Sequence, residues 1–164
     1  MQAAQPDFLL PYPVDIGWHL PPVSRQMTLR QFQERHPLLY GEGTWPDANI
    51  HSDPEAAKAE GLTEPVGSAP TFFAMITRAM MSTFGRGWIE GGATSLKMIK
   101  SVYARNFVTA RGFLREKKPE GDSVRYVFEV WVENELKEKV VVGTASALVP
   151  AAFEAHGFQP GEPA

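Results

Sequence analysis

The chain has 164 residues, 43% hydrophobic and 21% charged, values typical of one globular domain that buries a sizeable core. Its net charge of −3, without a dense cluster of Lys and Arg, argues against nucleic acid as a partner. It has no cysteine, which excludes disulfides, thiolate catalysis and cysteine-ligated metals.

The chain begins with a proline-rich stretch, residues 1–24, which also carries several aromatic and aliphatic residues. This density of proline argues against a helix and predicts an extended arm. Because the arm is too apolar for a free tail, we expect it to pack on the body of the protein or on a second subunit. A short helix is predicted next, over residues 28–36, with Thr28 as its N-cap and Pro37 ending it.

Three polar side chains follow within five residues: Asp47, Asn49 and His51. They precede a predicted short helix that starts at the N-cap Asp53 and stops before Gly61. A carboxylate and an imidazole held against a rigid element suit general acid/base catalysis, although Asp, Asn and His are also common in turns. The four histidines of the chain are far apart in sequence and show no metal-binding spacing, so neither a metal nor another cofactor is expected.

Residues 70–84 form the strongest predicted helix, preceded by Ser68 as a candidate N-cap and followed by Gly85. Apolar residues occupy almost every side of it, which is typical of a buried helix. Its three methionines suit core packing better than ligand binding. A glycine-rich turn around Trp88 is expected to follow.

The remaining sequence changes to the period of strands, which we predict at 93–103, 107–116, 123–133 and 138–149. Small residues on the last strand indicate close approach of a helix or of another backbone. One buried helix wrapped by an antiparallel sheet is an α+β packing. Residues 150–164 are expected to form a loosely ordered tail.

With this order of elements, the chain resembles the MaoC-like, (R)-specific enoyl-CoA hydratase family, which has the hot-dog fold. Residues 50–62, IHSDPEAAKAEGL, are similar to the family's I/L-H-x-D-x-x-x-A-x-x-x-G-(F/L). Residues 64–70, EPVGSAP, stand where the family has a segment before its central helix, and residues 141–147, VVGTASA, resemble its last strand. The resemblance covers about residues 25–149, which we expect to be a single hot-dog domain.

The resemblance implies that an Asp and a His share a water molecule and add it to an enoyl thioester, or eliminate it, while a backbone amide at the start of the central helix stabilises the enolate. It implies His51 as the principal acid/base and Asp47 as its partner, while Asn49 is expected to be an orienting residue or a turn former rather than a catalyst. Because Pro70 has no N–H, the amide donor is that of Ala69 or Thr71, beside Ser68. We expect the acyl group to lie along the central helix, under Phe72, Phe73 and the Trp88 turn.

The sequence departs from the family's D-x-N-P-(I/L)-H, because Asp47 is four rather than five residues before His51 and the proline is missing. Either Asp47 reaches the site through a shorter loop, or His51 works alone or with Asn49. A structural subunit of a heteromeric hydratase and a lyase acting on a small molecule without a thioester therefore remain alternatives. A thioesterase is disfavoured, because residues 70–84 contain no carboxylate.

The basic residues Lys97, Lys100 and Arg105 suit either a nucleotide phosphate or a solvated strand edge. The expected partner is a small acyl thioester, of coenzyme A or of a carrier protein. Since a hot-dog protomer leaves a sheet edge and a helix flank uncovered, we expect a homodimer or a higher oligomer. We expect no membrane partner and a cytoplasmic location, because no apolar run approaches membrane-spanning length and no secretory signal is visible.

Overall fold

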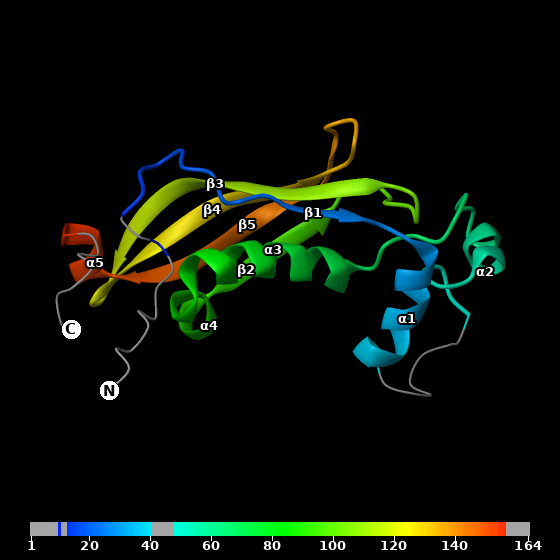
Figure 1. Ribbon diagram of the computed structural model, residues 1–164, viewed down its shortest axis with the longest axis horizontal. Helices are drawn as coiled ribbons and strands as arrows, with labels where there is room; N and C mark the ends of the chain where they lie inside the picture. The colour runs from blue at the N-terminus through cyan, green and yellow to red at the C-terminus, as the bar shows by residue number, and fades with distance from the viewer. Residues whose placement is uncertain (1–9, 11–12, 41–47, 157–164) are drawn as a thin grey trace.

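The computed structural model describes residues 10, 13–40 and 48–156 of the chain (Figure 1). Its centre is a five-stranded, fully antiparallel sheet in the order β1-β3-β4-β5-β2, so that β1 and β2 are the two edges. The strands are β1 Val23–Gln26, β2 Ala93–Met98, β3 Phe107–Glu120, β4 Ser123–Glu133 and β5 Lys139–Pro150.

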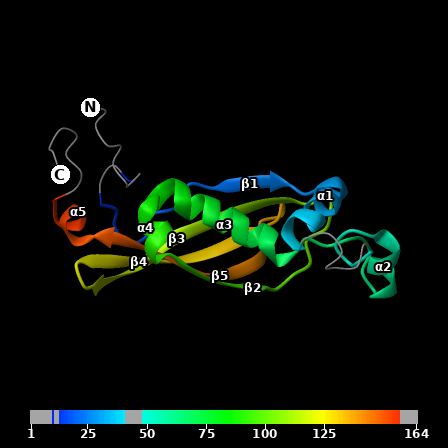
Figure 2. The same cartoon turned by 90° about the horizontal axis from the view of Figure 1, so that it is seen from below.

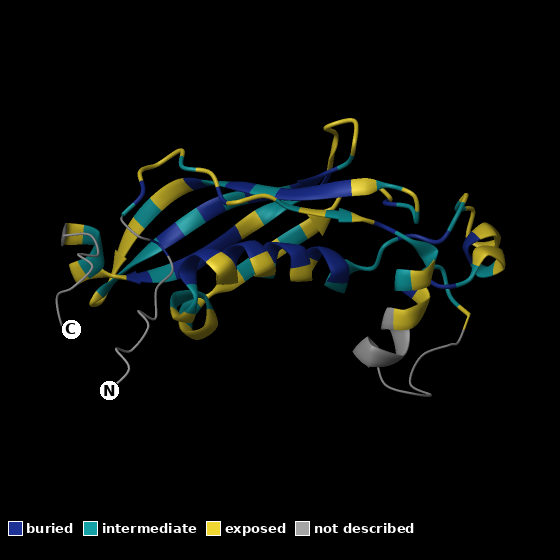
Figure 3. Cartoon of the chain, viewed as in Figure 1, coloured by how far each residue is buried: buried dark blue, intermediate teal, exposed yellow. Residues whose placement is uncertain are grey.

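One long helix, α3 (Ala69–Phe84), lies along one face of this sheet (Figure 1; Figure 2). Ser68 is its N-cap residue, and Gly85 ends it in a conformation with φ of 48°. The helix buries one side against the sheet, and the core between them is formed from both elements (Figure 3). The expected α+β hot-dog arrangement, a buried helix with an antiparallel sheet around it, is therefore confirmed. Its largest buried side chains include Phe72, Ile76, Met80 and Phe84 from α3 and Tyr126 and Phe128 from β4.

The small residues of β5 have the two uses that the sequence suggested. Ala145 and Ala147 are buried in the core. A Cβ at Gly143 would lie 2.0 Å from the backbone oxygen of Ser95, so only glycine lets β2 pair this closely with β5.

The described part of the proline-rich arm packs on the body of the same chain. The amide of Leu20 donates to the Gly112 oxygen at 2.9 Å, and that of Gly17 donates to the Leu114 oxygen at 2.7 Å. Val14 and Leu20 are buried. The arm therefore follows β3 and continues directly into β1, which pairs with the start of the same strand.

Two local predictions were wrong: the end of the first helix and the form of the segment at Trp88. Helix α1 runs from Leu29 to Tyr40, so Pro37 lies inside it and does not end it. A proline removes one hydrogen bond from a helix, but its fixed φ is compatible with helical geometry, so the helix can continue. The expected glycine-rich turn at Trp88 is a short helix, α4 (Arg86–Gly91), in which Arg86 pairs with Glu90 at 2.5 Å.

The first predicted strand is also shorter than expected, because β2 ends at Met98 and not at residue 103. The amides of Ile99 and Lys100 both donate to the single oxygen of Val140, at 2.9 and 3.2 Å, and the ladder stops there. The chain then leaves the sheet, and the amide of Gly67 donates to the Val102 oxygen at 2.8 Å. This departure brings residues 98–102 beside the start of α3.

Residues 151–156, where a loose tail was expected, form helix α5 (Ala151–His156). Glu154 on this helix accepts a hydrogen bond from the hydroxyl of Tyr126 and pairs with Lys117 at 2.5 Å. Half-buried Phe153 packs against the core. None of the helices in the described ranges is long and apolar enough to cross a bilayer.

Candidate active site

His51 sits in a tight turn between α1 and the short helix α2 (Pro54–Ala59). The carboxamide oxygen of Asn49 accepts a hydrogen bond from the His51 amide at 2.8 Å, and its backbone oxygen accepts one from Asp53 at 2.9 Å. Asp53 in turn caps α2 through a 2.7 Å bond from the Ala56 amide. The turn is thus fixed at both ends, and Asn49 orients the backbone of the histidine.

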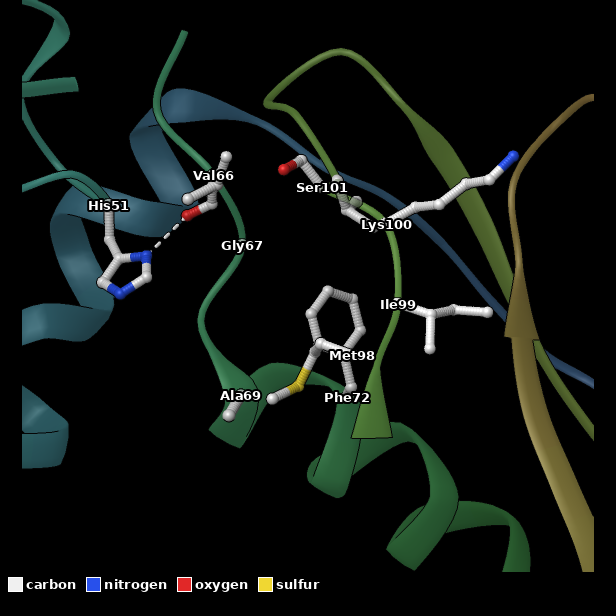
Figure 4. Close-up of a pocket in the computed structure, with 10 residues that line it drawn as sticks. His51, Val66, Gly67, Ala69, Phe72, Met98, Ile99, Lys100 and Ser101 are labelled. Carbon is white, nitrogen blue, oxygen red and sulfur yellow. Dashed lines mark hydrogen bonds between the residues drawn. The ribbon is translucent and has the colours of Figure 1, made fainter. Parts of the chain in front are cut away.

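The imidazole of His51 is held in a defined tautomer. Its Nδ1 lies 2.8 Å from the backbone oxygen of Val66 (Figure 4). A carbonyl oxygen can only accept, so Nδ1 carries the proton and donates it. In the neutral ring, Nε2 then bears the lone pair, and it makes no hydrogen bond to any residue of the described ranges. This is the tautomer that a general base acting through Nε2 requires.

The acceptor of this hydrogen bond is itself held by backbone pairing. The amide of Val66 donates to the Ile50 oxygen at 3.0 Å, and Val66 forms an isolated antiparallel bridge with Tyr103. Arg105 and Glu64 join the same two segments through an ion pair at 2.5 Å. The strand-like segment that holds His51 is therefore tied to the loop after β2.

A pocket of ≈ 510 Å³ opens beside His51 (Figure 4). One wall is apolar and comes from α3 and from the chain after β2. Gly67 forms part of another wall, where a Cβ would lie 3.0 Å from Cζ of Phe72. The pocket is lined by His51, Val66, Gly67, Ala69, Phe72, Met98, Ile99, Lys100, Ser101 and Val102.

The start of α3 also borders this pocket, through Ala69. The amide of Thr71 donates to the Ser68 oxygen at 3.1 Å and Thr71 is buried, while Pro70 has no N–H. Ala69, the first helical residue, has an amide without an intrahelical acceptor, and no described residue accepts from it. Of the two predicted amide donors, the geometry therefore favours Ala69. Ser68 occupies the N-cap position, but its hydroxyl makes no capping hydrogen bond.

Two predicted pocket residues are not brought to this site. Phe73 is 36% exposed and points to a different side of α3 from Phe72. Trp88 lies on α4, beyond the far end of α3, and packs partly buried against the core. Since a helix rises about 1.5 Å per residue, α3 is roughly 24 Å long, and Trp88 follows its C-terminal end whereas the His51 pocket lies at its start.

Asp47 lies outside the described residues, so its role remains a prediction from the sequence. Six lining residues were not predicted from the sequence: Val66, Gly67, Met98, Ile99, Ser101 and Val102. The last four lie in a segment predicted as a regular strand, and no local signal marked the point at which the chain leaves the sheet.

The charges around the pocket are mostly paired. Lys100, the cationic side chain that lines it, pairs with Glu138 at 2.8 Å. Arg105 pairs with Glu64, as described above. Within the described ranges, no group of three His, Asp or Glu side chains is placed to hold a metal ion. Among the described lining residues, the pocket therefore offers the His51 ring nitrogen, the Ala69 amide and the Ser101 hydroxyl for chemistry.

Comparison with known proteins adds evidence on the fold. No protein-family model matches the sequence, and no curated protein matches it. The structure is similar to the unliganded R-hydratase PhaJ1 from Pseudomonas aeruginosa, with a TM-score of 0.68 and 16% identity, over 87% of this chain and 86% of that one. It is also similar to a MaoC-like dehydratase from Rhodospirillum rubrum, with a TM-score of 0.65 and 16% identity, over 84% and 93% of the two chains.

A third similar structure is the ChsH1–ChsH2 complex from Mycobacterium tuberculosis, with a TM-score of 0.66 and 16% identity, over 84% of this chain and 100% of that one. The chain has the hot-dog fold that these structures share. At these identities the likeness establishes the fold, and the activity has to be argued from the site.

In this hot-dog domain, the candidate site lies at the start of the central helix. His51 arrives from the turn before α2, Ala69 from the helix itself, and the apolar wall from the chain after β2. A helix N-terminus carries partial positive charge and suits an oxygen that becomes negative during a reaction. The arrangement can hold an apolar substrate with a carbonyl group near Ala69 and a proton-transfer site near His51.

Proposed function

We propose that the protein is a hydratase or dehydratase that adds water to an enoyl thioester, or eliminates it from a 3-hydroxyacyl thioester, of coenzyme A or of a carrier protein. One observation carries this proposal. The Val66 oxygen fixes the proton of His51 on Nδ1, which leaves Nε2 as the nitrogen for proton transfer beside a pocket that the Ala69 amide also borders. The shared fold with proteins named (R)-hydratase and MaoC-like dehydratase supports it.

In hydration, the oxygen of a water molecule bonds to C3 of the enoyl group while His51 or Asp47 takes one of its protons. The π electrons of the double bond move toward the thioester oxygen, whose negative charge the Ala69 amide stabilises. The enolate then collapses as C2 receives a proton from the acidic member of the pair. Elimination is the same sequence in reverse, so no cofactor is required for either direction.

The roles of the other polar residues follow from the sequence and the turn. Asp47 is proposed as the partner of His51, because it lies four residues earlier in the same segment. Asn49 is proposed as an orienting residue, since its carboxamide oxygen holds the amide of His51. The acyl chain would lie against Phe72, Met98 and Ile99, which form the apolar wall.

The test is to incubate the purified protein with crotonyl-CoA and with longer enoyl-CoAs while following loss of the conjugated enone absorbance. We expect turnover in the wild type and its loss in His51→Ala. His19→Ala is the matched control, because His19 is exposed and lies against Phe113, away from the pocket. No turnover with any enoyl thioester, or full turnover in His51→Ala, would exclude the proposed mechanism.

A second candidate is a subunit of a heteromeric hydratase that leaves catalysis to its partner. Two similar structures are complexes by name, ChsH1–ChsH2 and the HadBC dehydratase of Mycobacterium tuberculosis. The shifted position of Asp47 also suits this alternative. It predicts that the pure chain is inactive, whereas turnover by the pure chain excludes it.

A third candidate is a lyase for a small molecule that carries no CoA phosphate. It is supported by the ion pair between Lys100 and Glu138, because a lysine that already has a carboxylate partner is less suited to bind a phosphate.

We also propose that the protein forms a homodimer or a higher oligomer through the side of the sheet that ends at β2. In the described part of the chain this strand is an edge of the sheet, and Met98 and Ile99 at its end are 45% and 47% exposed. Light scattering at micromolar concentration tests this, because a monomeric mass would contradict it.

A further inference from the structure

The backbone of Val66 has both of its polar groups turned toward the segment that contains His51. Its amide donates to the Ile50 oxygen at 3.0 Å, and its oxygen accepts from Nδ1 of His51 at 2.8 Å. Both of these bonds lie on one side of Val66, because the amide and the carbonyl of one extended residue point the same way. The position of the carbonyl that sets the tautomer of His51 therefore depends on what supports Val66 on its other side.

The support on that other side comes from the chain after β2. Val66 forms an isolated antiparallel bridge with Tyr103, and the neighbouring Gly67 amide donates to the Val102 oxygen at 2.8 Å. Val102 is buried, so this contact is shielded from water. A shift of Tyr103 therefore shifts the Val66 carbonyl, and the ring of His51 with it.

Asn106 holds Tyr103 by both of its backbone groups. The Tyr103 amide donates to Oδ1 of Asn106 at 2.8 Å, and the Asn106 amide donates to the Tyr103 oxygen at 3.0 Å. Nδ2 of Asn106 donates to Glu135 at 3.0 Å, in the turn between β4 and β5. The Asn106 oxygen accepts from the Met27 amide at 2.9 Å, just after β1. All four polar groups of Asn106 therefore hold this one turn in place.

We propose that Asn106 is a positioning residue for His51. It acts through Tyr103 and Val66 and does not itself line the pocket. Such a residue can control a reaction that it does not touch, because a misplacement of about 1 Å in a reacting group can cost about 10²-fold in rate. The kinetic part of this inference rests on the proposed hydratase function, whereas the effect on the His51 ring does not.

The first readout is the tautomer of His51, measured in long-range ¹H–¹⁵N NMR spectra of the full chain with labelled histidine. His51→Ala assigns the signal among the four histidines. We expect the wild type to carry the proton on Nδ1, as the hydrogen bond to Val66 requires. In Asn106→Ala the ring should lose this fixed tautomer, so the shifts of its two nitrogens should move toward each other.

The second readout is steady-state turnover of crotonyl-CoA. Asn106→Ala should lower kcat about tenfold and change KM less than about twofold, because the acid/base group is displaced while the substrate contacts remain. The double variant Asn106→Asp, Glu135→Gln should recover most of the loss. It keeps an oxygen acceptor for the Tyr103 amide and exchanges the carboxamide and the carboxylate of the second hydrogen bond.

The matched control is Asn134→Ala. The side-chain oxygen of Asn134 accepts from the amides of Leu136 and Glu138, both at 3.0 Å, so it closes a turn by the same chemistry within residues 134–138. We expect this variant to lose a similar free energy of unfolding in urea as Asn106→Ala does. The nitrogen shifts of His51 and kcat should stay as in the wild type.

If Asn106→Ala does not fold, Arg105→Gln takes its place. Arg105 is 70% exposed and pairs with Glu64 at 2.5 Å across the same two segments, so its loss should change the same readouts by about two- to threefold. The proposal is overturned if the substituted protein keeps the His51 shifts of the wild type, or if Asn134→Ala moves them as far. In a wild type without turnover the proposed function fails, and the shifts still decide the role of Asn106.

Discussion

The two ends of α3 use polar groups in opposite ways. At the C-terminal end, the ring of Phe84 packs edge-on against those of Tyr126 and Phe128, with centroids 6.0 and 5.5 Å away. The Tyr126 hydroxyl donates to Glu154, which Lys117 neutralises. At the N-terminal end, His51 and Ala69 instead border an open pocket, and neither the second ring nitrogen of His51 nor the Ala69 amide bonds to a described residue.

The C-terminal end of α3 therefore contributes mainly to stability, whereas the N-terminal end carries the groups that we propose for catalysis. Closed packing and complete pairing favour folding, whereas a site for a reaction has to keep a proton-transfer group and a hydrogen-bond donor for its substrate. Substitutions at the two ends should therefore change different measured quantities. Five predictions test this separation, from the largest expected effect to the smallest.

The largest effect is expected from the proposed acid/base pair, His51 and Asp47. His51→Ala, Asp47→Asn and the double variant should each lower turnover by about 10²- to 10⁴-fold, by similar factors, because groups that act as a unit are not additive. The free energy of unfolding should change little. Steady-state kinetics and urea denaturation measure the two quantities. Near-normal activity in Asp47→Asn, beside an inactive His51→Ala, would show that Asp47 does not reach the site.

The next largest effect is expected at the other end, on stability. Phe84 is fully buried, so Phe84→Ala should lower the free energy of unfolding by about 3–5 kcal/mol, through lost burial and the cavity left behind. Residual folded protein should keep its turnover per molecule. Met81→Ala is the matched control on the same helix, because Met81 is 43% exposed and should lose less than about 1 kcal/mol. Equal losses in the two variants would contradict the packing described.

The third prediction concerns pH. Burial, together with the hydrogen bond to Glu154 and its charge, raises the pKa of Tyr126 above its ordinary value of about 10. A raised folded-state pKa means that this stability is present below pH 10 and is lost as the pH rises further. Tyr126→Phe should cost about 1–3 kcal/mol near pH 7 and should show a shallower alkaline loss than the wild type. The measurement is urea denaturation of both proteins at a series of pH values. If the free energy of unfolding falls equally steeply above pH 10 in the two proteins, the assignment to Tyr126 is wrong.

The fold was largely predictable because periodicity reports burial directly. The strand from 123 to 133 was predicted with its observed bounds, and the central helix to within one residue at its start. Errors arose where local signals competed with tertiary contacts. Pro37 looked like a helix stop, and residues 99–103 continued a strand pattern although the backbone crosses to Gly67 there.

The sequence predicted only those parts of the candidate site that depend on residues close together in the chain. The turn that contains Asn49 and His51 could be found from residue types and the cap of α2. The Val66 carbonyl that sets the tautomer could not, because any residue supplies a backbone oxygen and the sequence does not show which one is in reach. Phe72 and Phe73 also look equivalent in sequence, and only the orientation of the helix on the sheet distinguishes them.

The fourth prediction tests the wall that joins His51 to the helix. A Cβ in Gly67→Ala would meet Cζ of Phe72 at 3.0 Å and Cε of Met27 at 3.3 Å, so the phenyl ring should be displaced. Overpacking of this kind costs about 1–3 kcal/mol of stability. We expect KM for long enoyl-CoAs to rise several-fold more than KM for crotonyl-CoA. An unchanged ratio of the two KM values would show that Phe72 does not limit the acyl site.

The smallest effect is expected from Phe73→Ala, although the sequence placed Phe73 in the acyl pocket. Its side chain is 36% exposed and does not line the His51 pocket, so the variant should lose less than about 1 kcal/mol and keep its chain-length preference within about twofold. If Phe73 belongs to the surface between protomers, its loss should lower the mass seen by light scattering on dilution. A changed chain-length preference would instead show that Phe73 reaches the acyl group, from its own protomer or across that surface. In that case, the reactive end of α3 would extend further along the helix than the pocket of one protomer does.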